Sequence, residues 1–158
     1  MSKPLSAQTA LAPAASTVED VLALVRSRGG RVTSPRRVIL EALFEAAQPS
    51  VGSGHLTAPQ LTEAVRHRAP DVHMSTVYRN LDDLQRMGVV VHSHMGHGPA
   101  TYQLASLAHA HLICEACGAT VEAPEALVRE LAREAQTELG FSIDPYHFAI
   151  LGRCAACQ

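Results

Sequence analysis

The segment STVYRNLDDLQRMGVVVHSHM, residues 75–95, decides the fold because a helical pattern changes there to a strand pattern. Val77, Leu81 and Leu84 recur at the spacing that places side chains on one face of a helix. Ser75 is a suitable cap for the start of this helix, and Gly88 suits its end. Residues 89–95 are β-branched and alternate in polarity, which is typical of a strand. A helix followed directly by a strand is therefore predicted.

The flanking sequence extends this unit in both directions. Downstream, GHGP (96–99) predicts a turn and ATYQL (100–104) a second strand. Upstream, apolar residues at helical spacing predict three further helices, over about 17–28, 34–47 and 58–69. Several helices followed by a hairpin outline a winged helix-turn-helix, although other small α+β folds share this outline. We assign this domain to residues 17–105.

A different pattern occupies residues 106–158. Residues 106–110 resemble a hinge, and two short strands, HLIC (111–114) and ATVE (119–122), flank a cysteine pair. An amphipathic helix is expected over 124–140, and a strand-like return over 141–154. The fold class is therefore α+β: an N-terminal winged helix-turn-helix and a C-terminal α/β unit.

Composition limits the class of protein. Of the 158 residues 47% are hydrophobic and 18% charged, which supports a buried core and argues against global disorder. No apolar run approaches the roughly 20 residues of a membrane helix. Residues 1–16, interrupted by Pro4 and Pro13, are expected to form a disordered tail and not an export signal. We therefore expect a cytoplasmic protein with no membrane partner.

The charges are distributed unevenly. Residues 1–91 hold ten of the 13 basic and eight of the 15 acidic residues, a net charge of +2. Residues 92–158 hold the other three and seven, a net charge of -4. A solvated surface could produce this difference, but it also fits a DNA-facing first half.

The four cysteines form two CxxC pairs, Cys114 with Cys117 and Cys154 with Cys157. In a reducing compartment this pattern favours one tetrahedral zinc ion over disulfides. A redox CxxC or unrelated thiols are the alternatives. Four thiolates leave no open position on zinc, so the expected ion is structural and neither senses nor catalyses.

Six histidines are candidate metal ligands. His92 and His94 lie two residues apart on a predicted strand, so their rings should project from one face. The pair at the hinge, His109 and His111, has the same spacing. Isolated histidines are usually surface residues, but clustering near one junction favours a site. All-nitrogen ligand sets suit zinc, nickel or copper better than iron. The other two candidates are His55 and His147.

Over residues 18 to 158 the chain resembles the ferric uptake regulator superfamily of metal-dependent bacterial repressors. The order of STVYR and HLICxxCG is the most specific part of this likeness. The matching stretches are RVTSPRRVILEAL (31–43), HLTAPQL (55–61), STVYRNLDDLQRMGVV (75–90), HAHLICEACG (109–118) and HFAILGRCAAC (147–157).

The resemblance implies a homodimer that binds double-stranded DNA operators through its winged helix and pairs through its C-terminal dimerisation domain. Hydroxyl groups and arginines suit phosphates, and a tyrosine can pack on thymine methyls. A core position for Tyr78 is the alternative. The implied DNA-binding residues are Arg36, Ser75, Thr76, Tyr78, Arg79 and Asn80.

The resemblance also implies regulatory metal sites. His55, His109, His111 and Glu122 match a hinge site, with Gln103 where the iron-sensing members have a glutamate. A third site of some members is lost, because its ligand positions hold Ala108, Ala110 and Arg129.

The histidine-rich strand resembles the nickel-responsive branch of the superfamily, in which His92, His94 and His147 would form a nickel site. We therefore expect a metal-dependent repressor of metal uptake genes that has no small-molecule substrate. Its resemblance to the nickel-responsive branch favours nickel as the regulatory metal. A zinc or iron regulator that uses the hinge site is the alternative, and a peroxide sensor a third. A zinc enzyme and a metal-storage module are disfavoured, since HExxH is absent and storage leaves STVYR without a role.

Overall fold

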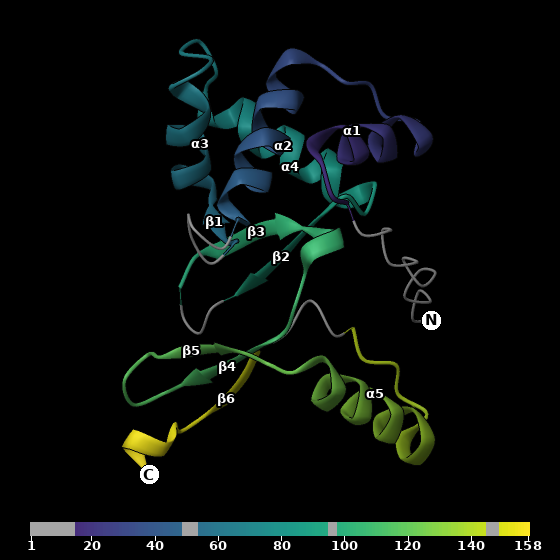
Figure 1. Ribbon diagram of the computed structural model, residues 1–158, viewed down its shortest axis with the longest axis vertical. Coiled ribbons are helices and arrows are strands. Elements are labelled where there is room, and N and C mark those ends of the chain that lie inside the picture. The colour runs from purple at the N-terminus through teal and green to yellow at the C-terminus, as the bar shows by residue number, and fades with distance from the viewer. Residues whose placement is uncertain (1–14, 49–53, 95–97, 145–148) are drawn as a thin grey trace, which may run out of the picture.

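The computed structural model describes residues 15–48, 54–94, 98–144 and 149–158. Within these ranges the chain forms two units, and each unit has its own three-stranded sheet (Figure 1). The expected mixture of helices and sheets is confirmed. Most of the expected N-terminal tail and half of the expected turn at 96–99 lie outside the described residues.

The first unit packs helices on one side of a small sheet. Its strands lie in the order β1-β3-β2, and both pairings are antiparallel. In Figure 1, α2, α3 and α4 stand above this sheet and α1 lies at one end of it. The elements are α1 (Val18–Ser27), α2 (Ser34–Ala46), β1 (Leu56–Thr57), α3 (Ala58–Arg66), α4 (Met74–Arg86), β2 (Val90–His94) and β3 (Ala100–Leu104).

Threonine side chains begin the first three helices, as their sequence favours. Thr17, Thr33 and Thr57 each accept a hydrogen bond from the backbone three residues later. The predicted start of α4 was wrong by two residues, because His73 precedes its first turn and Ser75 lies inside the helix. The His73 carbonyl accepts the first helical bonds, from the N–H groups of Thr76 and Val77. Backbone geometry at His73 therefore starts α4 without a side-chain cap.

One apolar core holds this unit together. It draws on every helix, and its members with no exposed surface include Leu22, Leu40, Leu61 and Leu81. Tyr102 and Leu104 on β3 also join this core. The sheet is therefore fixed against the helices, and α4 is anchored with its opposite face outward.

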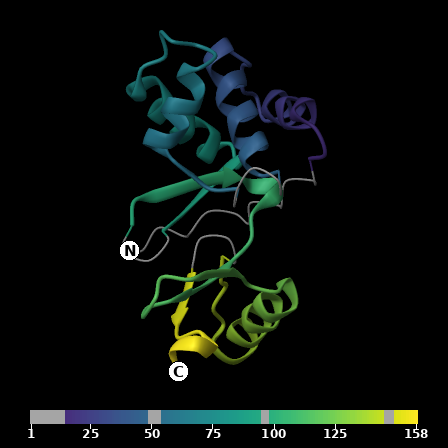
Figure 2. The same cartoon turned by 60° about the vertical axis from the view of Figure 1, so that its left-hand side comes forward.

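The second unit is a smaller sheet with one helix beside it (Figure 2). Strand β5 pairs antiparallel with β4, while β6 pairs parallel with β4 on the other side. Its elements are η1 (Ala105–Leu107), β4 (His111–Cys114), β5 (Thr120–Glu122), α5 (Glu125–Leu139), β6 (Ala149–Gly152) and η2 (Ala155–Cys157).

Two pairings were not predicted. The two-residue strand β1 adds to β3 through Leu56 opposite Tyr102, and it brings the end of the loop before α3 to the sheet. The parallel pairing of β6 with β4 brings the second cysteine pair next to the first. Both pairings therefore position candidate metal ligands. No helix in the described ranges is long and apolar enough to span a membrane.

Candidate metal centres and DNA-facing helix

The four cysteines meet at the end of the second sheet. Their sulfur atoms all lie within 4.8 Å of one another, and Cys117 Sγ is 3.8 Å from Cys154 Sγ. A tetrahedral zinc ion with Zn–S bonds of about 2.3 Å holds its sulfurs about 3.8 Å apart. A disulfide requires about 2.05 Å, and the structure has all four thiols free. This arrangement fits one zinc ion and does not support disulfides.

The acidity of these thiols points to the same conclusion. The backbone N–H of Cys154 donates to Cys114 Sγ, and with further backbone N–H groups it lowers the pKa of Cys114 to about 6. The neighbouring thiols, Cys154 first, raise the pKa of Cys157 to about 11. Four sulfurs this close cannot all ionise without a cation between them. Bound zinc would supply that cation and deprotonate the whole set.

A second cluster lies where the two units meet, and it consists of three histidines. One ring nitrogen from each of His55, His109 and His111 lies within 4.8 Å of the others. The ring centroids are 4.5 Å apart for His55 and His111 and 4.6 Å apart for His109 and His111. His55 precedes β1, whereas His111 begins β4 and His109 lies two residues before it, so the cluster joins both units. An ion held here would bridge them.

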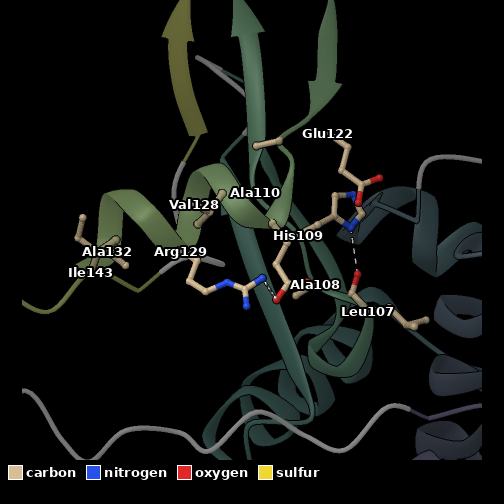
Figure 3. A pocket seen from close by; sticks show the side chains of 11 residues that line it. Leu107, Ala108, His109, Ala110, Glu122, Val128, Arg129, Ala132 and Ile143 are labelled. Carbon is tan, nitrogen blue, oxygen red and sulfur yellow. Dashed lines mark hydrogen bonds and ion pairs between the residues drawn. The ribbon is translucent and has the colours of Figure 1, made fainter. Parts of the chain in front are cut away.

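The local structure prepares these rings to bind a cation. Burial first, and then the neighbouring His55 and His109, lower the pKa of His111 to about 4. His111 is therefore neutral at physiological pH, as a metal ligand must be. His109 Nδ1 lies 3.0 Å from the Leu107 carbonyl oxygen (Figure 3), so this nitrogen donates and Nε2 remains available as a ligand.

Glu122 borders the three histidines but is not part of their ligand group. It lies opposite His111 across the β4–β5 pairing and lines the same pocket of about 750 Å³. Its carboxylate does not belong to the group of atoms within 4.8 Å, and the residue is exposed. The structure therefore brings together three of the four predicted hinge ligands. Gln103 also lines this pocket, and its side chain is buried.

The expected nickel site is described in part. His92 and His94 project from one face of β2, with ring centroids 5.8 Å apart. Gln85 of α4 places its Nε2 2.5 Å from His92 Nδ1, which links this ring to the helix. The third predicted ligand, His147, lies outside the described residues, so the site stays a prediction.

The outer face of α4 carries the predicted DNA-binding side chains. Ser75 and Arg79 are exposed, and Tyr78 has 44% of its surface exposed. A core position for Tyr78 is therefore excluded. Thr76 and Asn80 are half-buried on the same helix. This face can meet a DNA groove without rearrangement of the core.

Arg36 has a different environment from the one expected of a DNA contact. Its side chain is 10% exposed, and its guanidinium pairs with Asp83 at 2.8 Å. Arg36 Nε also donates to Asn80 Oδ1 at 3.1 Å, and its Nη1 donates to the Arg31 carbonyl at 2.9 Å. These bonds tie α2 to α4 beneath the exposed face. A direct contact with DNA stays a prediction, whereas the structure gives Arg36 a positioning role.

The model of the ferric uptake regulator family matches residues 27–150, which include α4, the histidine cluster and the first cysteine pair. The chain belongs to the ferric uptake regulator family. The chain is similar to the peroxide-responsive repressor PerR of Staphylococcus aureus. The two are 28% identical over 141 residues, or 89% of this chain and 91% of the relative.

Solved structures of the family resemble this chain over most of its length. The ferric uptake regulator of Pseudomonas aeruginosa with manganese is 30% identical and superposes with a TM-score of 0.67, covering 85% of this chain and 97% of the other. The ferric uptake regulator of Vibrio cholerae is 26% identical with a TM-score of 0.61, covering 82% and 96%. The likeness therefore spans both units.

The three positions at which the sequence predicts the loss of a third metal site border a pocket of about 520 Å³ beside α5 (Figure 3). Two of them, Ala108 and Ala110, offer no ligand atom. The third, Arg129, places its guanidinium 3.3 Å from Glu125. A cation is disfavoured beside a guanidinium, so this pocket does not suit a metal.

Sequence reasoning missed two residues that connect these sites. Asp83 and Gln85 both lie on α4, and neither belongs to a recognisable motif. Their partners, Arg36 and His92, become neighbours only when the chain folds. A carboxylate on a helix otherwise expected to approach phosphates was the one available signal for Asp83.

Proposed function

We propose that this chain is a metal-dependent transcriptional repressor that binds inverted-repeat operators as a homodimer and controls metal uptake genes in the cytoplasm. One observation carries the proposal: His55 of the first unit joins His109 and His111 of the second in one ligand cluster. A bridging ion can bind all three only when the units hold one relative position. Metal binding therefore selects that position from those the free chain samples.

The position of α4 explains how this selection reaches DNA. We interpret α2, α3, α4 and the β2–β3 hairpin as a winged helix-turn-helix, with α4 entering the major groove. A dimer reads two half-sites at a fixed spacing, so both recognition helices must be held at the matching distance. Metal release frees the angle between the units and lowers operator affinity. The residues assigned to DNA are Arg36, Ser75, Thr76, Tyr78, Arg79 and Asn80.

The second unit exposes the apolar surface that a dimer would bury. Along α5, Leu127 is 47% exposed and Leu131 is 40% exposed. Leu139 and Phe141 at the end of this helix are 78% and 62% exposed. Several large apolar side chains on one small unit are typical of a protein interface. We assign this surface to homodimer contacts.

Nickel is the proposed regulatory metal because the ligands are nitrogen atoms. The hinge cluster contributes three imidazoles, and His92 with His94 contribute two more on β2. Nickel and zinc prefer such sets, whereas iron and manganese favour more oxygen ligands. In this proposal His147 completes the site of His92 and His94. The alternative is a zinc- or iron-responsive regulator that uses His55, His109, His111 and Glu122.

The test is operator affinity measured by gel shift with Ni²⁺, Zn²⁺, Fe²⁺, Mn²⁺ or no added metal. The protein keeps its structural zinc, and exchangeable metal is removed by chelation. We expect at least about tenfold tighter binding with nickel, which corresponds to about 1.4 kcal/mol. Equal binding in the chelated sample would overturn metal dependence, and a response to zinc alone would favour the alternative.

Single substitutions separate the two histidine sites. In the nickel proposal, His92→Ala abolishes the nickel response of operator binding. In the alternative, His92→Ala leaves that response intact and His109→Ala abolishes the response to another metal. His67→Ala is the matched control, since His67 is an exposed histidine of the same chain outside both clusters.

Three other functions have less support. A peroxide sensor is suggested by the likeness to PerR, but the histidine cluster includes no carboxylate. Peroxide-dependent loss of operator binding by the iron-loaded protein would support it. A zinc enzyme needs an open position on zinc, and four thiolates leave none. Metal storage gives no role to the exposed face of α4.

A further inference from the structure

One buried polar group beside the histidine cluster has no partner. Gln103 lies on β3 with 2% of its surface exposed, and its Nε2 has no acceptor in the described part of the chain. A buried donor without a partner costs about 1–3 kcal/mol. A protein can keep such a donor when a bound ligand supplies the missing acceptor. The Gln103 amide therefore indicates a ligand site.

The strand pattern directs Gln103 toward the histidines. Its neighbours Tyr102 and Leu104 belong to the core under the helices, and side chains alternate along a strand. Gln103 and Thr101 therefore share the opposite face, and both line the pocket of His55, His109 and His111. Gln103 thus lines the same pocket as the three histidines, with its Nε2 covered by the surrounding atoms.

The charge of the bound metal ion indicates which kind of group accepts the hydrogen bond from Gln103 Nε2. Three neutral imidazoles leave a divalent ion with its full double charge, whereas four thiolates more than neutralise it. Among the described residues that line this pocket, Glu122 has the one carboxylate, and it is exposed and lies outside the ligand group. A partly enclosed cation without a carboxylate attracts an anion from solution. An N–H donor beside such an anion makes a stronger bond than one to a neutral acceptor.

We propose that the histidine cluster binds a metal ion together with a small monovalent anion, such as chloride, and that Gln103 Nε2 holds this anion by a hydrogen bond. Gln103 is thus a positioning residue that selects metals accepting three imidazoles and an exchangeable anion. This inference rests on the proposed metal site at His55, His109 and His111. It makes the occupancy of the hinge site depend on anions as well as on metal.

The test uses Co²⁺ as a spectroscopic substitute and azide as the anion. The full-length protein carries zinc at its cysteines and Co²⁺ at the hinge, in a His92→Ala/His94→Ala background that removes the other histidine pair. Azide is titrated while the visible absorption of Co²⁺ is recorded. We expect a saturable change in this spectrum. An unchanged spectrum would overturn the proposal.

Two substitutions assign the effect to the amide. Gln103→Met has a similar volume but no donor, and it should weaken azide binding about tenfold to hundredfold, as expected for a lost hydrogen bond to a charged group. Gln103→Glu places a carboxylate in the pocket, so it should abolish the azide response and raise the affinity for Mn²⁺ relative to Co²⁺. Equal azide affinity in Gln103→Met and the unsubstituted protein would contradict the role of Gln103.

The control is Thr101→Val, which changes a residue of the same strand face whose hydroxyl donates to the Ser93 carbonyl at 3.2 Å. It should leave azide binding unchanged. Zinc content and circular dichroism verify that each variant is folded. If Gln103→Glu fails to fold, the comparison of Gln103→Met with Thr101→Val decides the question. None of these measurements involves DNA, so a failure of metal-dependent repression would be seen separately.

Discussion

The two units of this protein are stabilised in different ways. In the described residues, nineteen buried residues form the core of the first unit, whereas three form that of the second. Helix α5 is 15 residues long, yet only Val128 along it is buried. A unit with so small a core needs another source of stability. The first unit is thus held by its own packing, and we infer that zinc and a second copy of the chain hold the other.

The largest expected effect comes from removing one cysteine. Cys117→Ser should release the ion and unfold the second unit, because a structural zinc ion contributes on the order of 10 kcal/mol to the folding of small domains. Helices α1 to α4 should remain folded. Zinc content together with amide hydrogen exchange checks this, with protection lost in β4 to β6 and retained in α2 to α4.

Glu115→Gln is the control for that substitution, since Glu115 is an exposed neighbour of the same cysteine pair. It should retain zinc and full protection. If Cys117→Ser also kept β4 to β6 protected, the second unit would be stable without its ion, and the contrast between the units would be wrong.

A substitution in the apolar core tests whether the first unit is stabilised by its own packing. Leu81 is fully buried on α4, and Leu81→Ala should lower the free energy of unfolding of the first unit by about 2–5 kcal/mol. The zinc content should not change. Met74→Ala on the same helix is the control, because Met74 is 44% exposed. Denaturant unfolding followed by hydrogen exchange in each unit measures both effects.

The exposed face of α5 allows a test of the second copy. Leu131→Asp should raise the dimer dissociation constant at least about hundredfold, since two copies each lose about 1.5 kcal/mol or more of apolar burial. Sedimentation equilibrium measures this, and zinc content should be unchanged. Arg133→Ala is the control, because Arg133 lies on the opposite side of the helix and pairs with Glu130 and Glu134. An unchanged constant in Leu131→Asp would move the interface elsewhere.

In both units the sequence predicted the helices better than the strand pairings, and the reason is physical. Helices with one buried face carry a period that can be read directly, so α1 to α4 were predicted within a few residues. Strand β1 has two residues and no period, and only its pairing with β3 reveals it. The parallel pairing of β6 likewise depends on contacts between distant segments.

Site residues divide in a similar way. Spacing indicated the two cysteine pairs, and resemblance indicated His55, His109 and His111, which the structure brings together. Neither could place Glu122, because its distance from the cluster depends on how β5 lies beside β4. The burial of Arg36 was equally hidden, since its partner Asp83 is 47 residues away in sequence. Local patterns therefore identify candidate groups, and long-range packing decides which of them meet.

The smallest expected effect lies at the start of α1 and shows how local the stability of the first unit can be. Thr17 accepts a bond from the Asp20 N–H, and the Asp20 carboxylate accepts one from the Thr17 N–H. Thr17→Ala should lower stability by about 1 kcal/mol. The side chain of Thr17, and then its backbone, lower the pKa of Asp20. This contribution is therefore present above the unfolded pKa of Asp20 and is lost as the pH falls through its folded pKa.

The same substitution at α3 is a matched control for that pH dependence. Thr57 forms an equivalent pair with Gln60, whose amide does not titrate. The cost of Thr57→Ala should stay constant with pH, whereas the cost of Thr17→Ala should shrink in acid because a protonated Asp20 is a weaker acceptor. Hydrogen exchange of the first-turn amides of each helix, at neutral pH and at a pH below the folded pKa of Asp20, compares the two. A parallel decline at both helices would assign the pH effect to the whole unit, and the carboxylate of Asp20 would then have no special role.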